Sequence, residues 1–178
     1  MTKTSIALIG FMATGKTTIG KILANKLGSP YRHIEMDLLI EEFAGKTIPE
    51  IFSQEGEKKF RKLERVICKK ISKLDHTVIS CGGGVVLDDR NIKDLHKKAI
   101  IVHMNSSLES IYDRIIKNGI NLRPVANKGN SKEELTRIYN IRIPLYQNAA
   151  DFEVDTNNKD IKEIIKEILE KVNLFQKS

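Results

Sequence analysis

Residues Ser5 to Thr17 read Ser-Ile-Ala-Leu-Ile-Gly-Phe-Met-Ala-Thr-Gly-Lys-Thr, an apolar run followed by a glycine-rich segment that ends in Lys-Thr. Gly10 and Gly15 let the backbone curl so that successive N–H groups face an anion, next to the positive end of the following helix. The segment matches G-x-x-x-x-G-K-[ST], in which Lys16 reaches the outer phosphates of a nucleotide and Thr17 offers a hydroxyl to Mg²⁺. A chance match is the alternative, but the strand-like run before the segment and the helical period after it both fit a phosphate-binding loop.

The rest of the chain alternates strand-like and helical patterns. This alternation is typical of a parallel sheet that is covered on both faces. We therefore expect an α/β fold over residues 1–178, a single domain with three layers and a central five-stranded parallel sheet. The expected strands are Ser5–Ile9, Tyr31–Glu35, Val78–Cys81, Ala99–Met104 and Phe152–Asp155. Ligands bind beyond the carboxyl ends of such strands, so the residues that follow each strand are the first to inspect.

Composition favours a globular protein with anionic ligands. Hydrophobic residues make up 40% of the chain and charged residues 30%, and no apolar run approaches the roughly 20 residues of a membrane span. The net charge of +7 suits an anionic ligand or a nucleic acid, but 6% aromatic residues and no tryptophan provide no stacking surface for bases. The four histidines lack metal-ligand spacing, and we expect Cys68 and Cys81 to be small buried residues. We expect a cytoplasmic monomer without nucleic-acid or membrane partners.

A segment without a helical or strand period follows residue 118. Residues 119–131 are rich in Gly and Asn, and they include Arg123 and Pro124. A phosphotransferase can use such a loop as a lid, because closure excludes water and brings a cation onto the transferring phosphoryl group. A surface connector with a solvated arginine is equally compatible with the composition of this loop.

Two carboxylates stand at the end of the second expected strand. Glu35 and Asp37 are at i and i+2, so in an extended segment their side chains point the same way. One could accept a hydrogen bond, and later a proton, from a hydroxyl that attacks phosphorus, while the other could hold Mg²⁺ through water. Alternatively, Asp37 could merely cap a helix that follows at Leu38.

Two arginines lie in settings that could orient them. Arg61 stands three residues before Glu64, a helical spacing at which the acid can hold the guanidinium in place. An oriented arginine can grip a carboxylate with two parallel hydrogen bonds, although most such pairs are surface ion pairs. Arg142 precedes Pro144, and the proline should kink or end the helix and thereby fix the arginine at its end.

Three consecutive glycines, Gly82 to Gly84, follow the third expected strand. Glycine is unfavourable in chain entropy, so the run predicts a close approach of the backbone to a ligand, with N–H groups available to ligand oxygens. A tight strand-to-helix turn is the alternative. Ser80 occupies the strand-end position that carries an acid in other proteins with this loop, which predicts contact with a magnesium-bound water.

Together these segments resemble the shikimate kinase family. The shared features, from Ile6 to about Asn157, are the phosphate-binding loop, the acidic pair, Arg61 between Phe60 and Glu64, the triple glycine, Arg123-Pro124, and Arg142 before Pro-Leu-Tyr. The resemblance implies a P-loop kinase fold with a mobile lid. It also implies ATP-dependent phosphorylation of the 3-hydroxyl of shikimate, a step towards chorismate and the aromatic amino acids, with Mg²⁺ as the cofactor.

The resemblance implies a role for each site residue as well. Asp37 would bind the shikimate hydroxyls and could act as the base, Lys16 would be the transition-state cation, and Arg123 would be the lid arginine. The shikimate site would comprise Asp37, Arg61, Gly82, Gly83, Gly84 and Arg142, within a substrate-binding segment at about residues 34–61 and beyond it. The ATP site would comprise Thr14, Gly15, Lys16, Thr17, Thr18, Ile19, Arg114, Arg123 and Lys159. Thr17 would bind Mg²⁺ directly, and Glu35 and Ser80 would bind it through water.

The chain departs from the family pattern at three places. Glu35 stands where an Asp is usual, Ala13-Thr14 stands where Gly or another small residue is frequent, and Val125-Ala126 replaces a bulky pair. These changes bear on the geometry around Mg²⁺ and on lid closure, and they remove no residue that the chemistry requires.

Two kinds of rival remain open at this point. Gluconate kinases and nucleoside monophosphate kinases share the loop and the size, but a monophosphate acceptor would require a dianion clamp and a base pocket. A non-catalytic nucleotide-binding or nucleic-acid-binding module belongs to another class. The intact Lys16, Thr17 and Asp37 argue against such a module, because binding alone needs no positioned base.

Overall fold

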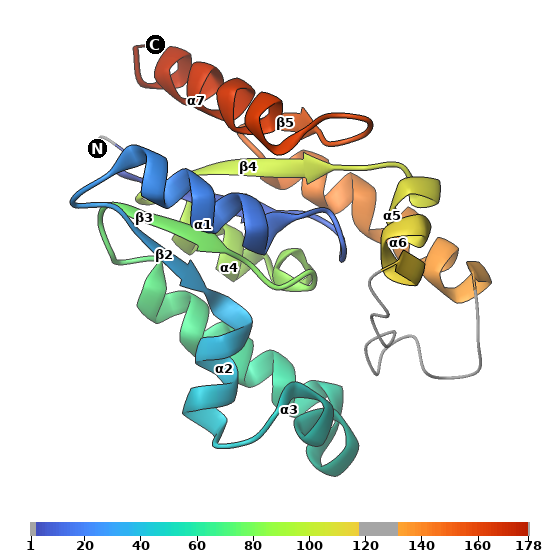
Figure 1. The fold of residues 1–178 in the computed structure, drawn as a ribbon. Coiled ribbons are helices and arrows are strands. Elements are labelled where there is room, and N and C mark those ends of the chain that lie inside the picture. The colour runs from blue at the N-terminus through green and yellow to red at the C-terminus, as the bar shows by residue number, and fades with distance from the viewer. Residues whose placement is uncertain (1–2, 118–131, 178) are drawn as a thin grey trace.

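A parallel β-sheet lies at the centre of the protein (Figure 1). The computed structural model describes residues 3–117 and 132–177. Its strands are β1 (Ser5–Ile9), β2 (Arg32–Glu35), β3 (Thr77–Ser80), β4 (Ala99–Asn105) and β5 (Phe152–Asp155). They lie in the order 2-3-1-4-5, and every neighbouring pair is parallel. The predicted five-stranded parallel sheet is therefore confirmed, with strand boundaries that differ by no more than one residue.

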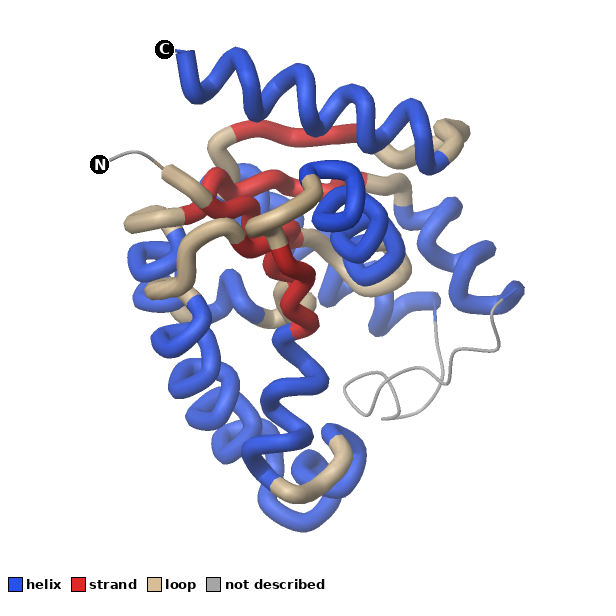
Figure 2. The backbone as a smooth tube through the Cα atoms, turned by 60° about the vertical axis from the view of Figure 1, so that its left-hand side comes forward, coloured by secondary structure: helices blue, strands red, loops and turns tan. Residues whose placement is uncertain are grey.

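Helices cover both faces of this sheet, as the prediction required (Figure 2). They are α1 (Lys16–Leu27), α2 (Met36–Ala44), α3 (Ile48–Ile71), α4 (Asp89–Leu95), α5 (Leu108–Lys117), α6 (Lys132–Ala149) and α7 (Ile161–Lys177), with a short 3₁₀ helix, η1 (Val85–Leu87). Within β1, Ile6 and Leu8 pack with α1 and α7, whereas Ala7 and Ile9 pack with α3 to α6. Side chains alternate along a strand, so the continuous apolar run of β1 supplies both cores.

The strand order positions the phosphate-binding loop. β1 lies between β3 and β4, so the chain leaves β1 for one side of the sheet and later returns to the other side. Ligands of open α/β sheets bind at such a reversal, beyond the carboxyl ends of the strands. The loop after β1 and the glycine run after β3 are neighbours at this edge, because β1 and β3 pair directly.

Two local predictions are wrong. α2 begins at Met36, immediately after β2, so Asp37 lies in the first turn of a helix rather than in an extended segment, and the helix does not begin at Leu38. The buried side chain of Met36 packs into the core and fixes this early start. α6 continues past Pro144 to Ala149, so Arg142 lies inside the helix. Tyr146 and Ala149 are buried after the proline, and this packing outweighs the one hydrogen bond that proline removes.

α3 consists of two helical segments that meet at Gly56. Thr47 begins the helix with a capping box, in which its side chain accepts from the Glu50 N–H and the Glu50 side chain accepts from the Thr47 N–H. Gly56 has φ of 78°, a left-handed conformation that glycine adopts readily. The change of direction brings Phe52 of the first segment against Phe60 of the second, with 4.8 Å between ring centroids. No helix in the described ranges is both long and apolar enough to cross a membrane.

Candidate functional site

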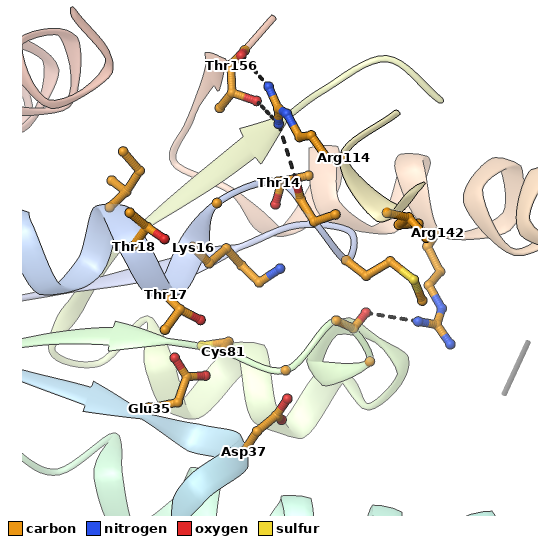
Figure 3. Close-up of a pocket in the computed structure, with 18 of the residues that line it drawn as sticks. Thr14, Lys16, Thr17, Thr18, Glu35, Asp37, Cys81, Arg114, Arg142 and Thr156 are labelled. Carbon is orange, nitrogen blue, oxygen red and sulfur yellow. Dashed lines mark hydrogen bonds between the residues drawn. The ribbon is translucent and has the colours of Figure 1, made fainter. Parts of the chain in front are cut away.

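A cavity of about 560 Å³ lies at the carboxyl ends of β1, β2 and β3. Predicted site residues from all parts of the chain line it: Thr14, Gly15, Lys16, Thr17, Thr18, Ile19, Glu35, Asp37, Arg61, Gly82, Gly83, Gly84, Arg114, Arg142 and Lys159. Figure 3 shows Arg114 and Thr156 on one side of the phosphate-binding loop and Asp37 and Glu35 on the other. Arg123, the predicted lid at 119–131, and Val125-Ala126 lie outside the described residues.

Backbone conformation explains the small residues of the phosphate-binding loop. Gly10 has φ of 144°, and a Cβ there would come within 2.5 Å of the Met104 carbonyl oxygen. Gly15, the residue before α1, has φ of 89°. Ala13 is also left-handed, with φ of 59°, a conformation that costs an L-residue roughly 1 kcal/mol. This explains why glycine suits position 13 and shows that alanine is accommodated there with some strain.

Cationic groups surround the loop. Lys16 Nζ donates to the carbonyl oxygens of Gly10 at 2.9 Å and Phe11 at 2.7 Å, so its ammonium lies over the loop (Figure 3). The first turn of α1 contains no acidic residue, which leaves the positive end of the helix uncompensated. These features together favour a polyanion at the loop.

Arg114 connects α5 to this loop and to the turn before α7. Its guanidinium donates to the Ala13 carbonyl at 3.3 Å, and to the hydroxyl and carbonyl oxygens of Thr156 at 3.2 and 2.7 Å. Lys159 lines the cavity as well and forms an ion pair with Glu167 at 2.7 Å. The side chains predicted to flank a nucleotide therefore meet at one end of the cavity.

Arg61 is held on the other side of the cavity by two carboxylates of its own helix. Its Nη1 donates to Glu64 at 2.8 Å, and its Nη2 donates to Glu57 at 3.1 Å. Glu64 is 1% exposed, and burial raises the pKa of its carboxyl, an effect that the positive charge of Arg61 opposes. The predicted i,i+3 pair is thus a partly buried pair at the cavity wall rather than a surface ion pair.

The glycine run allows charged side chains to approach the backbone. A Cβ at Gly82 would come within 2.7 Å of Asp37 Oδ1 and 3.3 Å of Glu64 Oε1. A Cβ at Gly84 would come within 2.5 Å of Arg61 Cζ, and Nη1 is nearer still. The run was predicted to bring the backbone close to a ligand. What the structure shows is a close approach of the backbone to charged side chains that line the cavity.

Arg142 reaches this run from α6. Its Nη1 donates to the Gly83 carbonyl at 3.2 Å, and the Tyr146 hydroxyl donates to the same oxygen (Figure 3 shows the bond from Arg142). Arg142 is 9% exposed. The two arginines predicted to bind a carboxylate therefore line the same cavity, Arg61 from α3 and Arg142 from α6.

The prediction for Ser80 does not fit the structure. Ser80 is fully buried, and its hydroxyl donates to the Lys16 carbonyl at 3.0 Å and lies 2.9 Å from His33 Nε2. Its side chain points toward α1, where a Cβ on Gly20 would meet it, and it does not line the cavity. The next residue, Cys81, lines the cavity instead, near Thr17 and Glu35 (Figure 3). Burial keeps the pKa of the Cys81 thiol well above its usual value.

Sequence reasoning missed several lining residues. Ile48, Phe52 and Phe60 were not assigned to the site, although all three line the cavity. The available indication was the spacing of Phe52 and Phe60 around Gly56, just before Arg61. Met12, Cys81, Ile138, Ile161 and Ile164 also line the cavity and were not predicted to do so.

Comparison with known proteins shows which family this chain is similar to. A family model described as shikimate kinase matches residues 12–173. The shikimate kinase of Caldicellulosiruptor saccharolyticus is 42% identical over 153 residues, which are 86% of each chain. The shikimate kinase from Acinetobacter baumannii, solved in complex with shikimate, superimposes with a TM-score of 0.88 and 31% identity over 96% of this chain and 93% of that one. A gluconokinase from Sinorhizobium meliloti, at 15% identity and a TM-score of 0.61 over 97% of this chain and 93% of that one, is similar in fold alone.

Proposed function

This chain belongs to the shikimate kinase family, and from this premise we propose that it transfers the γ-phosphoryl group of ATP to the 3-hydroxyl of shikimate, a step towards chorismate. The observation that carries the proposal is a single cavity that joins a phosphate-binding loop to an acid and two arginines. A phosphoryl donor and a hydroxylated carboxylate need these two sets of groups side by side. The family assignment favours shikimate over gluconate or a nucleoside monophosphate, and it favours an enzyme over a pure binding module.

The donor half holds the phosphates of ATP. The backbone of the loop and the start of α1 receive the phosphate oxygens, and Thr14, Gly15, Thr18 and Ile19 shape this surface. Lys16 exchanges its two carbonyl acceptors for phosphate oxygens, because a charged acceptor forms the stronger hydrogen bond. It then stabilises the charge of the transferring group. Arg114 and Lys159 flank the nucleotide.

Mg²⁺ fits the oxygen donors at this end of the cavity. The Thr17 hydroxyl and the Glu35 carboxylate both line it, and Mg²⁺ prefers oxygen ligands. The described part of the chain holds no cluster of three or more His, Cys, Asp and Glu side chains suited to a metal. Such a cluster is not needed for a cation that keeps several waters and binds phosphates. We assign Thr17 as a direct ligand and Glu35 as a ligand through water, and the ion would neutralise charge on the phosphates.

The acceptor half holds shikimate. Arg61 and Arg142 carry the positive charges that a carboxylate requires, and Glu57 and Glu64 keep Arg61 oriented. Asp37 accepts hydrogen bonds from the ring hydroxyls. It orients the attacking hydroxyl toward the phosphoryl group and can take its proton.

The lid, the oligomeric state and the compartment are also part of the proposal. Arg123 would reach the phosphates from a lid at 119–131. This role rests on the family pattern, because Arg123 and the lid segment lie outside the described residues. The chain would be a single-domain monomer in the cytoplasm. One chain supplies both halves of the cavity, which supports the monomer, and the use of ATP supports the compartment.

The test measures ADP release with ATP, Mg²⁺ and shikimate as substrates. Asp37→Asn should lower turnover by about 10²- to 10⁴-fold, the usual contribution of a positioned acid or base, while the KM for ATP stays within about twofold. Asp89→Asn is a matched control, since Asp89 also lies in the first turn of a helix but is exposed and does not line the cavity. Turnover with gluconate or a nucleoside monophosphate and none with shikimate would refute the proposed function.

A further inference from the structure

Tyr146 is a fully buried residue that contacts the backbone of the cavity wall. It lies in α6 one turn after Arg142, and it does not line the cavity. Its hydroxyl nevertheless donates to the carbonyl oxygen of Gly83, which does line it. The proposed function assigns this tyrosine no part, although it belongs to the Pro-Leu-Tyr segment that follows Arg142.

The Gly83 carbonyl has two donors from the same helix. Arg142 Nη1 donates to it at 3.2 Å, and the Tyr146 hydroxyl donates to the same oxygen. A carbonyl oxygen accepts two hydrogen bonds, so both acceptor positions are in use. When a carboxylate ligand draws the guanidinium away, the bond from Tyr146 remains. Without that hydroxyl, the carbonyl would compete with the ligand for Arg142, because an unpaired polar group is unfavourable in partly buried surroundings.

The position of the Tyr146 hydroxyl is fixed by its surroundings. Its ring stacks on His103 of β4, with 5.2 Å between centroids and an angle of 24° between ring planes. His103 is 1% exposed and lies 2.8 Å from Glu153 through Nδ1. Burial raises the pKa of Tyr146 to about 12, so the hydroxyl keeps its proton and remains a donor near neutral pH.

The hydrogen bond also fixes a peptide that glycine would leave free to rotate. The Gly83 carbonyl and the Gly84 N–H belong to one planar peptide and point in opposite directions. With glycine on both sides, this peptide meets little steric resistance to rotation. Holding the carbonyl toward α6 therefore sets the direction of the Gly84 N–H, on the residue against which the Arg61 guanidinium packs.

We propose that Tyr146 is a positioning residue for shikimate, the phosphoryl acceptor. Its hydroxyl holds the Gly83 peptide in place and thereby allows Arg142 to bind the carboxylate of shikimate. This inference rests on the proposed function, because it concerns the same acceptor half. It adds a residue that acts on the acceptor through Gly83 and Arg142 and leaves the donor half unaffected.

The test compares two Tyr→Phe variants in α6. Tyr146→Phe should raise the KM for shikimate about tenfold, as expected for the loss of one hydrogen bond, and should change the KM for ATP by less than about twofold. Tyr139→Phe is the matched control, because Tyr139 also donates to a backbone carbonyl, that of Ser106 at 3.0 Å, and Ser106 does not line the cavity whereas Gly83 does. It should leave both KM values unchanged. A shikimate KM within twofold of wild type in Tyr146→Phe, or equal rises for both substrates, would overturn the inference.

A second comparison separates positioning from simple packing. In an Arg142→Lys background the guanidinium is absent, so adding Tyr146→Phe should raise the shikimate KM by less than about threefold. A repeated tenfold rise would show that the tyrosine acts independently of Arg142. Both comparisons can also be made by measuring the affinity for shikimate with titration calorimetry at low temperature, at which a destabilised variant stays folded. Lack of turnover by the wild type would refute the proposed function itself, whereas unaffected Tyr146→Phe would refute only this role.

Discussion

Replacing Gly84 by alanine tests how the acceptor half is assembled. Gly84 has φ of −102° and ψ of 1°, which alanine can adopt, so the backbone should not change. The new Cβ would stand 2.5 Å from Arg61 Cζ, whereas an ordinary contact begins at 3.4 Å. Because Nη1 is nearer still, the guanidinium must retreat by at least about 1 Å, a displacement large enough to disrupt an oriented charge pair. Its 2.8 Å bond to Glu64 must stretch or break at the same time.

The expected loss follows from the bonds that Arg61 would make. Hydrogen bonds to charged groups contribute about 1.5–3 kcal/mol, so Gly84→Ala should lower kcat/KM for shikimate by about 10- to 150-fold. The KM for ATP should change little, because Arg61 lies in the acceptor half. Stability should fall by no more than about 3 kcal/mol, the contribution of the bond between Arg61 and the buried Glu64, and alanine offsets part of this loss because it restricts the unfolded chain.

Gly83→Ala isolates the contact with Arg61, although Gly83 lines the same cavity. The nearest atoms to a Cβ at Gly83 lie at 3.7 to 3.8 Å, an ordinary contact distance, so the same substitution one residue earlier leaves Arg61 in place. Its effect on kcat/KM for shikimate should be several times smaller. The assay is ADP release, with shikimate varied at saturating ATP and then ATP varied at saturating shikimate. Unchanged kcat/KM for shikimate in Gly84→Ala, or a KM for ATP that rises in step with that for shikimate, would refute the reasoning.

Two further predictions concern buried ionisable groups. Burial raises the pKa of Glu64 above its ordinary 4.5, so folding favours its protonated form. The stability of the wild type should therefore fall relative to Glu64→Gln as the pH rises above 4.5. Urea unfolding at several pH values measures this difference, and a constant difference would contradict the raised pKa. Cys68 and Cys81 are free and buried, and burial raises the pKa of Cys68 to about 12, so neither thiol should react with a thiol reagent at about pH 8 before unfolding. Rapid labelling of the native protein would contradict that burial.

The fold was predictable because its determinants are local patterns. The apolar run Ser5–Ile9 is continuous because residues on its two sides enter two different cores, and that pattern indicates a buried parallel strand. The start of α2 and the length of α6 were not predictable in the same way. α2 begins at Met36 because the side chain of Met36 packs against distant parts of the chain. α6 continues through Pro144 because later residues of the helix, such as Tyr146, pack in the same way.

The donor and acceptor halves of the site also differ in how far the sequence predicts them. The donor half is encoded by consecutive residues, since Gly10, Gly15, Lys16 and Thr17 belong to one loop whose pattern follows from phosphate chemistry. Ser80 was misplaced because neighbouring residues of a strand point to opposite faces of the sheet. A shift of one residue therefore decides whether a side chain points toward α1, as Ser80 does, or into the cavity. A pattern of residue types at the end of a strand does not contain that information.

The acceptor half depends on three segments that are remote in sequence and meet at the glycine run. Each glycine has a different neighbour. The carboxylates of Asp37 and Glu64 lie close to Gly82, and the guanidinium of Arg61 lies close to Gly84. The carbonyl of Gly83 accepts hydrogen bonds from two side chains of α6. Side chains at these positions would separate the charged groups, so the run determines how closely acid and arginine can approach one acceptor. In the proposed function, the triple glycine therefore marks the place of the acceptor in the sequence, and the side chains of the helices packed against the glycine run would decide which acceptor binds.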